Sequence, residues 1–247
     1  MTRPYNFAPG PAMLPESVLK QIQSEMLDFH GCGWSILEAS HRGPQVTGVM
    51  TELKSRLRQL LSIPDTYDVL FCPGGGRMQF AMVPMNLLGA GTLSTYIITG
   101  AWSKAAAKEA LRFGRVQSAF SGSGNRIPAD EELEVIPETS YCAYCDNETI
   151  HGIEFERVPV LKDAEAVPLV ADMTSNFLTR PVDVNSGFFT LQHKRTLASP
   201  GSQLSCSGEI FWDSPALKCR RCLTTASTAE LTVCPIHLPF FSFMSPI

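Results

Sequence analysis

Residues 72–77 read Cys-Pro-Gly-Gly-Gly-Arg, a glycine-rich turn of the kind that binds anions. The apolar run before it predicts a buried strand over residues 67–71, and the apolar spacing after it predicts a helix over residues 80–88. Such a turn exposes backbone N–H groups at a helix N-terminus, where the helix dipole also favours negative charge. Gly76 and Arg77 would then cradle a phosphate. A tight connection without a ligand accounts for the turn about equally well.

Three further side chains, Trp102, Thr149 and Asp172, each follow a predicted strand. Trp102 would offer a broad aromatic face, and Thr149 would offer a hydroxyl. Asp172 would keep a nearby ring nitrogen protonated, because a carboxylate favours a neighbouring cation. Together with an anion cradle, these groups are what pyridoxal phosphate requires, apart from the lysine that forms its Schiff base. The pattern therefore predicts a pyridoxal phosphate site.

Each of these residues has a simpler interpretation when it is taken alone. A lone Trp102 is more often part of a core, and a lone Asp172 is more often a loop or helix-capping residue. Arg42 would grip a substrate carboxylate with its planar guanidinium, but a lone arginine is usually a solvated surface residue. Their shared placement past strand ends favours one joint site, since ligands of open parallel sheets bind there.

The elements that must position these residues alternate between strands and helices. This order predicts an α/β fold with a mainly parallel sheet and right-handed crossovers. The predicted helices begin near Leu14 and cover residues 45–61, 80–88 and 104–113, and the predicted strands cover residues 67–71, 95–99, 140–145 and 167–171.

Composition narrows the class of protein. The chain has 247 residues, which suffices for one or two domains, and its net charge of −4 argues against nucleic acid and anionic membranes as partners. No stretch is apolar enough to span a bilayer, and the first residues lack the apolar core of a signal peptide. We therefore expect a cytoplasmic enzyme whose eight cysteines stay reduced.

Several segments resemble the phosphoserine aminotransferases, and the similarity runs almost continuously from residue 4 to about residue 185. It is carried by Asn6-Phe-Ala-Pro-Gly-Pro-Ala12, Glu38-Ala-Ser-His-Arg42, Gly74-Gly-Gly-Arg-Met-Gln-Phe80, Val83-Pro-Met-Asn-Leu-Leu88, Gly100-Ala-Trp-Ser103, Asn147-Glu-Thr-Ile-His-Gly-Ile-Glu-Phe155 and Ala171-Asp-Met-Thr-Ser-Asn176. The resemblance implies the three-layer large domain of fold-type I pyridoxal phosphate enzymes. It also implies a homodimer with active sites at the subunit interface.

The same resemblance implies an activity and assigns residues to it. Members of this family exchange an amino group between glutamate and 3-phosphohydroxypyruvate in serine biosynthesis, and many in bacteria also serve pyridoxine biosynthesis. Carried over position by position, the cofactor contacts are Gly76, Arg77, Trp102, Thr149 and Asp172. Arg42 is the anchor for the substrate carboxylate. Met78 departs from the pattern, since a small residue is common there.

The resemblance ends near residue 186, and residues 187–247 have a different character. When this tail is back-translated and read one base earlier, residues 190–201 can encode Tyr-Ala-Ser-Ala-Gln-Lys-Asn-Ile-Gly-Gln-Pro-Gly, the context of the family's cofactor lysine. Residues 217–225 and 232–240 can encode later family segments in the same frame. We infer a partial large domain over residues 1–186 and a frameshifted tail without native fold over residues 187–247. The C-terminal small domain would then be absent.

This inference bears directly on catalysis. Lys194 lies near the position of the Schiff-base lysine, but the family's codon would straddle Lys194 and Arg195, so its neighbours are wrong. We therefore expect the chain as written to be inactive, as an inactive remnant of its gene.

Two non-enzymatic alternatives remain open. Cys219, Cys222, Cys234 and His237 have a spacing compatible with a tetrahedral zinc site. The frameshift explains the same cysteines without any metal. The glycine-rich turn would also suit a nucleotide-binding module, but it lacks both the Gly-x-Gly-x-x-Gly spacing and a following Lys-Ser/Thr.

Overall fold

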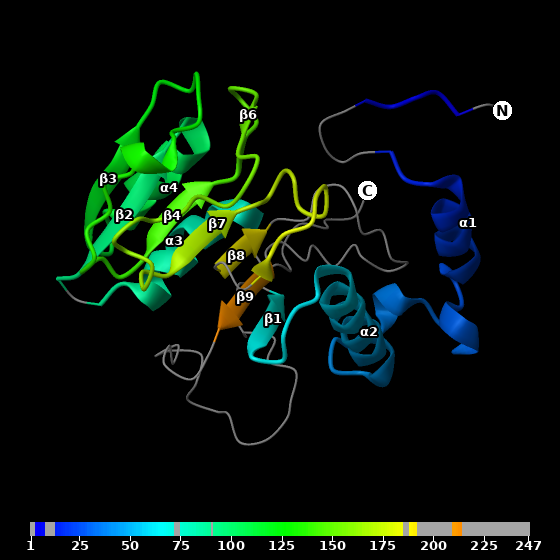
Figure 1. Ribbon diagram of the computed structural model, residues 1–247. Coiled ribbons are helices and arrows are strands. Elements are labelled where there is room, and N and C mark those ends of the chain that lie inside the picture. Colours follow the sequence, from blue (N-terminus) through cyan, green and yellow to red (C-terminus); the bar gives the residue numbers. More distant parts are fainter. Residues whose placement is uncertain are drawn as a thin grey trace, which may run out of the picture.

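The computed structural model describes residues 3–7, 13–71, 75–89, 91–184, 188–191 and 209–213. These residues form an α/β fold with one large sheet and a small two-stranded sheet. Figure 1 shows the large sheet with helices behind it and a separate helical N-terminal part at the side. Residues 72–74, Lys194 and the four tail residues of the zinc alternative lie outside the described residues. Among the described helices, none is long and apolar enough to cross a membrane.

The large sheet has the strand order β1-β9-β8-β7-β4-β2-β3. Its centre is parallel, since β2 pairs in parallel with β3 and β4, and β7 pairs in parallel with β4 and β8. The antiparallel pairs are β1 with β9 and β8 with β9. The parallel centre confirms the predicted fold class. The strands are β1 (Tyr67–Phe71), β2 (Leu93–Ile98), β3 (Arg115–Ser121), β4 (Cys142–Cys145), β7 (Leu169–Asp172), β8 (Phe188–Leu191) and β9 (Glu209–Asp213).

Two helices cover one face of this sheet, α3 (Gly75–Leu87) and α4 (Ala101–Ala110). Small residues of α4, including Ala107 and Ala110, pack with Ala143 and Val170 of the sheet in one buried cluster. Small side chains let the helix lie close to the strands, which brings its first turn to the sheet edge where ligands bind in such folds.

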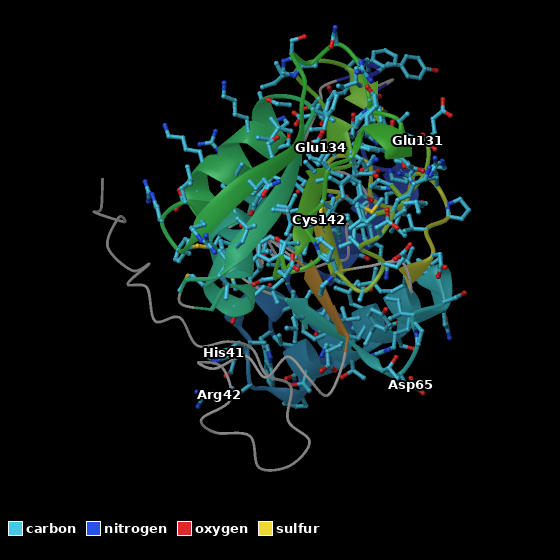
Figure 2. The ribbon with its side chains drawn as sticks, turned by 60° about the vertical axis from the view of Figure 1, so that its left-hand side comes forward. His41, Arg42, Asp65, Glu131, Glu134 and Cys142 are labelled. Atoms are coloured by element: carbon cyan, nitrogen blue, oxygen red, sulfur yellow. The ribbon has the colours of Figure 1, made fainter. Side chains whose placement is uncertain are left out.

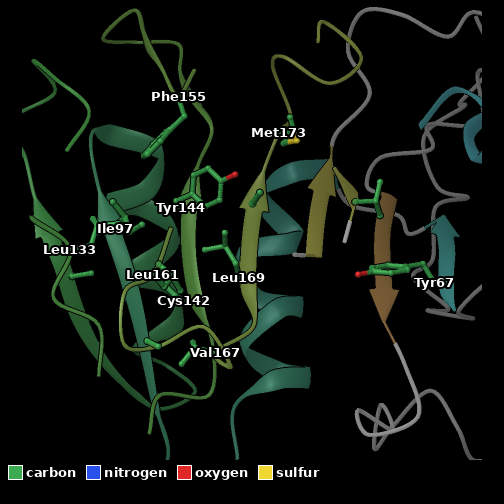
Figure 3. Packing of buried hydrophobic residues seen from close by; sticks show 14 of the residues in the cluster. Tyr67, Ile97, Leu133, Cys142, Tyr144, Phe155, Leu161, Val167, Leu169 and Met173 are labelled. Carbon is green, nitrogen blue, oxygen red and sulfur yellow. The ribbon is translucent and has the colours of Figure 1, made fainter. Parts of the chain in front are cut away.

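The opposite face of the sheet carries the larger core. Loops that connect the strands fold over this face, and Figure 3 shows Leu133, Phe155, Leu161 and Val167 packed there. The Tyr144 ring meets the Phe155 ring edge-on, with a centroid distance of 4.9 Å. Edge-to-face contact is a favourable arrangement for aromatic pairs. The two packed faces fix the register of β4 and β7, because a shift by one residue would exchange their buried sets.

The N-terminal part contains α1 (Glu16–Glu25), η1 (Phe29–Gly31), η2 (Ile36–Glu38) and α2 (Pro44–Leu61). Pro44 begins α2, where a missing N–H costs nothing. Ser62 ends it in the left-handed conformation, with φ of 52°. Arg58 donates from its two Nη atoms to the carbonyl oxygens of Pro64 and Tyr67, at 2.9 Å and 2.5 Å. These bonds tie the end of α2 to the start of β1.

The structure also differs from the sequence prediction at several element boundaries. Helix α4 begins at Ala101, three residues before the predicted start, because a distant side chain caps its first turn, as described below. Helix α3 begins at Gly75 and so includes the end of the glycine-rich turn. Strand β3 was not predicted, and neither was the small hairpin of β5 (Asn147–Glu148) and β6 (Ile153–Glu154). Strands β8 and β9 lie within residues 187–247, and the expectation that this tail lacks a native fold stays a prediction.

Candidate functional site

The candidate site lies at the carboxyl edge of the parallel strands β2, β4 and β7. Gly100 and the first turn of α4 follow β2, the β5–β6 hairpin follows β4, and Asp172 is the last residue of β7. Because these strands are parallel neighbours, their carboxyl ends meet at one edge. The backbone N–H of Asp146 donates to the carbonyl oxygen of Asp172 at 2.9 Å, which locks two of these ends together.

Trp102 and Thr149 are in direct contact. The indole Nε1–H of Trp102 donates to Thr149 Oγ1 at 2.8 Å. The tryptophan is half-buried in the first turn of α4, and the threonine lies in the turn of the β5–β6 hairpin. The hairpin turn thus places the hydroxyl at the edge of the aromatic ring.

Asp172 lines the same pocket as Trp102. Its Oδ1 accepts from both the N–H and the hydroxyl of Thr174, at 3.0 Å and 2.5 Å. Among the described residues, no donor is assigned to Oδ2, so this oxygen is available to a ligand. Burial raises the pKa of the Asp172 carboxyl, the Thr174 bonds lower it, and the charges of Glu148 and Asp146 raise it further. The net shift is upward.

Gly76 and Arg77 lie in the first turn of α3. Gly76 is buried, and the exposed side chain of Arg77 turns toward the tryptophan, with Cζ at 5.8 Å from the Trp102 ring centroid. That distance is within the range of a cation–π contact. The structure therefore brings Arg77, Trp102 and Thr149 together, with Asp172 in the pocket beside them.

Among the described residues, Arg42 has no hydrogen bond or ion pair with this group. Arg42 is exposed in the loop before α2, where its backbone N–H donates to Ser40 Oγ at 3.3 Å. Figure 2 shows Arg42 and His41 at the end of the molecule away from Cys142 of β4. Lys194 lies outside the described residues.

Sequence reasoning missed Glu148, which is completely buried beside the site. Its Oε2 accepts the backbone N–H of Trp102 at 2.8 Å. Its Oε1 accepts the N–H and the hydroxyl of Ser103, at 2.8 Å and 2.6 Å. The only signal in the sequence was a carboxylate directly before Thr149, just past a strand.

Gln79 was also missed. It is 2% exposed and lines the pocket with Trp102 and Asp172. Its Nε2 donates weakly to Met82 Sδ at 3.8 Å, while its Oε1 is buried without a partner among the described residues. Gln79 follows the glycine-rich turn by one helical turn, so its place in the motif was the available signal.

A second buried carboxylate lies between β4 and the β5–β6 hairpin. Asp146 is completely buried, and its two oxygens accept from Arg180 Nη2 at 2.7 Å and 2.5 Å. Asn176 Nδ2 also donates to this carboxylate. Burial raises the pKa of Asp146, and the bonds from Asn176 and Arg180 lower it, with a net shift upward. This network joins the end of β4 to the segment after β7.

Comparison with known proteins gives one consistent family. The sequence profile of the family described as aminotransferase class-V matches residues 4–188. The phosphoserine aminotransferase of Nitrosomonas europaea is 48% identical over 225 residues, which is 88% of this chain and 61% of that protein. That of Laribacter hongkongensis is 47% identical over 184 residues, or 73% of this chain and 50% of that protein.

Solved structures agree with these relatives. A phosphoserine aminotransferase from Bacillus circulans subsp. alkalophilus is 37% identical, with a TM-score of 0.76 over 85% of this chain and 56% of that chain. A phosphoserine aminotransferase from Trichomonas vaginalis, solved with pyridoxal phosphate bound, is 33% identical, with a TM-score of 0.75 over 85% of this chain and 58% of that chain. The chain thus spans about half to three fifths of the length of the proteins it matches.

Proposed function

The chain belongs to the class-V aminotransferases, and from that premise we propose that residues 4–186 are the cofactor-binding part of a phosphoserine aminotransferase. Such an enzyme exchanges an amino group between glutamate and 3-phosphohydroxypyruvate. The observation that carries the proposal is the grouping of Trp102, Thr149 and Asp172 at adjacent strand ends, with the N-terminus of α3 nearby.

The residues present fit pyridoxal phosphate. Trp102 offers a half-buried face for the ring. Asp172 Oδ2, which has no assigned donor in the described part of the chain, offers an acceptor for a protonated ring nitrogen. Gly76 and Arg77 offer the first turn of α3 for the phosphate. When bound, the cofactor supplies an electron-withdrawing ring, and the negative charge of Asp172 keeps that ring protonated.

The hydrogen-bond direction at Thr149 supports the same arrangement. Its oxygen already accepts the indole N–H of Trp102, so the hydroxyl proton is free to point elsewhere. We expect Thr149 to donate this proton to the ring oxygen of the cofactor. An oxygen that accepts such a bond is stabilised in its anionic form.

Arg42 would bind the substrate carboxylate from a second copy of the chain. It is exposed in the loop before α2, and Figure 2 shows it away from Cys142 of β4. The N-terminal part that carries it also exposes large apolar side chains, with Phe7 at 92% and Leu27 at 85% exposure. Apolar surface of this kind favours burial in an interface, which supports a homodimer whose active sites combine residues of both copies.

In this proposal, residues 187–247 are translated from a shifted reading frame, so Lys194 does not lie in the sequence context of a cofactor lysine. The gene's nucleotides across codons 184–195 test this directly. Read in the shifted frame, they should restore the Ser-Ala-Gln-Lys-Asn-Ile-Gly segment. A nucleotide sequence that cannot encode it would remove this explanation of the tail.

Amino transfer tests the proposed activity. We expect the chain as written to form no O-phosphoserine from glutamate and 3-phosphohydroxypyruvate in the presence of pyridoxal phosphate. We expect the frame-restored protein to form it, and Asp172→Asn in that protein to slow the reaction by at least about 100-fold, since one misplaced charge at such a site costs roughly this factor. A restored protein that does not transfer the amino group of glutamate to 3-phosphohydroxypyruvate would contradict the proposal.

A further inference from the structure

We propose that Glu148 is a positioning residue that fixes the orientation of Trp102, through the first turn of α4. This inference rests on the proposed function only for the reason that the positioning matters, because an aromatic face must be held in place to receive a cofactor ring. The contacts that carry it exist in the free protein. They can be tested there without any ligand.

The first step is the set of donors that Glu148 serves. Its two oxygens accept three hydrogen bonds, all from Trp102 and Ser103. Ser103 Oγ in turn accepts the backbone N–H groups of Thr99 and Gly100, at 3.0 Å and 3.1 Å. Because the serine oxygen accepts these two bonds, its proton is directed to the carboxylate. Glu148 therefore completes the cap of α4 from 45 residues away.

The second step is the need for a carboxylate rather than an amide. The first N–H groups of a helix lack partners within the helix and carry partial positive charge. A carboxylate accepts at both oxygens, whereas the amide of glutamine accepts at only one and presents N–H groups at the other. Glu148 is completely buried, and it forms no ion pair with any residue in the described part of the chain. The partial positive charge at the N-terminus of α4 thus compensates the negative charge of the buried Glu148 carboxylate.

The third step is the role of Gly100. Its φ of −169° is extended and open to any residue, so conformation does not require glycine. Space does: a Cβ there would lie 2.6 Å from His151 Nδ1, 2.7 Å from Glu148 Cδ and 2.8 Å from Glu148 Oε2. The backbone therefore approaches the carboxylate more closely than any other residue type would allow. Gly100 is thus fitted against both Glu148 and His151.

The last step joins Glu148 to its neighbour Thr149. Glu148 holds the backbone N–H of Trp102, and Thr149 holds its indole N–H. Consecutive residues of one hairpin thus grip both ends of the tryptophan. If the carboxylate releases the backbone of α4, the indole should lose its bond to Thr149 as well.

The experiment uses the full chain, labelled with ¹⁵N at the tryptophan indole, without ligand. The Trp102 resonance is assigned by its loss in Trp102→Phe. We expect Glu148→Gln to move this resonance and to speed its exchange with solvent roughly tenfold, the factor that one net hydrogen bond represents. Gly100→Ala should cause the same change, because its Cβ crowds the carboxylate, as well as His151, and keeps the charge of Glu148.

The matched control is Asp146→Asn, which alters the other completely buried carboxylate but contacts Asn176 and Arg180 rather than α4. It should lower stability and leave the Trp102 indole unchanged. An unchanged Trp102 resonance in whichever of Glu148→Gln and Gly100→Ala remains folded would overturn the inference. So would an equal change in Asp146→Asn.

The same samples separate this inference from the proposed function. A pyridoxal phosphate titration of the unsubstituted chain reports on the cofactor site, while the indole spectra report on the positioning of Trp102. If the indole responds as expected but the cofactor does not bind, the positioning role stands and the proposed function fails. If the cofactor binds but the indole does not respond, the positioning role fails alone.

Discussion

The indole N–H of Trp102 donates to the hydroxyl oxygen of Thr149 at 2.8 Å, across 47 residues of sequence. This bond joins the helix that follows β2 to the hairpin that follows β4. Thr149 accepts this bond, so we expect its own proton to point toward a ligand. A single contact thus orients both an aromatic face and a hydrogen-bond donor.

Substitution of Thr149 tests both roles. Thr149→Val keeps the shape but removes the hydroxyl, so we expect the affinity of the chain for pyridoxal phosphate to fall roughly tenfold, as for the loss of about one net hydrogen bond. Thr149→Ser retains the hydroxyl and should stay within about threefold of the unsubstituted chain. Equilibrium titration measures both. Equal affinities of the valine and serine variants would remove the hydroxyl from the site.

The raised pKa of Asp172 predicts that its charged form, which the cofactor site needs, lowers the stability of the fold. Burial is its main cause. Between the ordinary value of 3.8 and the raised value, the folded protein keeps a proton that the unfolded chain has lost, so stability falls as pH rises through this window. Asp172→Asn removes the penalty and keeps one acceptor oxygen for the two Thr174 bonds. We expect it to raise the free energy of unfolding by about 1 kcal/mol at pH 7, and by nothing below the ordinary value.

Asp130 supplies a control of opposite sign for the same urea titrations. Although burial raises its pKa, the hydrogen bonds from Arg157 and from the N–H of Val160 lower it overall. Its contribution is therefore present above the ordinary value and lost as pH falls through the lowered one. Asp130→Asn should destabilise the protein at pH 7, and the difference should vanish in acid. At pH 7, only Asp172→Asn should stabilise the protein. If neither it nor Asp130→Asn does so, or if both do, this account is contradicted.

Arg77 should favour binding of pyridoxal phosphate over pyridoxal, which lacks the phosphate group. Its guanidinium lies 5.8 Å from the Trp102 ring centroid, in the first turn of α3. We expect Arg77→Gln to weaken binding of pyridoxal phosphate by about 10-fold or more, the value of a hydrogen bond to a charged group. Binding of pyridoxal, which has no phosphate, should change by less than about threefold.

An exposed arginine just after α4 serves as the control for Arg77. Arg112 pairs with the half-buried Glu109. Arg112→Gln has the same change of charge and should leave both affinities unaltered. If Arg77→Gln weakens the two ligands equally, its side chain does not contact the phosphate.

The buried pair of Asp146 and Arg180 should dominate the local stability of the hairpin. Arg180→Met leaves a carboxylate that is completely buried without its cation, which costs about 3–5 kcal/mol. Asn176 remains as its partner, and loss of the arginine raises the pKa of Asp146 further, so the cost should shrink as pH falls. Urea unfolding of the double variant Asp146→Asn/Arg180→Met should recover most of the loss. A double variant that is no more stable than Arg180→Met would show that the pair acts through other contacts.

The sequence predicted the parallel centre of the sheet because short apolar runs and amphipathic helices alternate along the chain. It also placed Trp102, Thr149 and Asp172 at strand ends, and the structure brings Trp102 into contact with Thr149 and into one pocket with Asp172. Their roles as cofactor contacts, and that of Arg42 as a substrate anchor, remain predictions.

Other features could not be predicted, because they depend on contacts between distant residues. Helix α4 begins early because Glu148 caps it, and nothing near Ala101 encodes that partner. The β5–β6 hairpin is too short to show a strand period, although it positions Thr149. The place of Gln79 after the glycine-rich turn was its one signal, and that place does not separate a pocket-lining amide from an ordinary helical residue.

The most direct test of the central claim is a pyridoxal phosphate titration monitored by the fluorescence of Trp102. Trp34→Phe and Trp212→Phe leave Trp102 as the one tryptophan of the chain, which has three. The account predicts saturable quenching at one cofactor per chain, weakened by Asp172→Ala and by Thr149→Val. Quenching that does not saturate, or that neither substitution changes, would contradict the claim that these residues form the cofactor site.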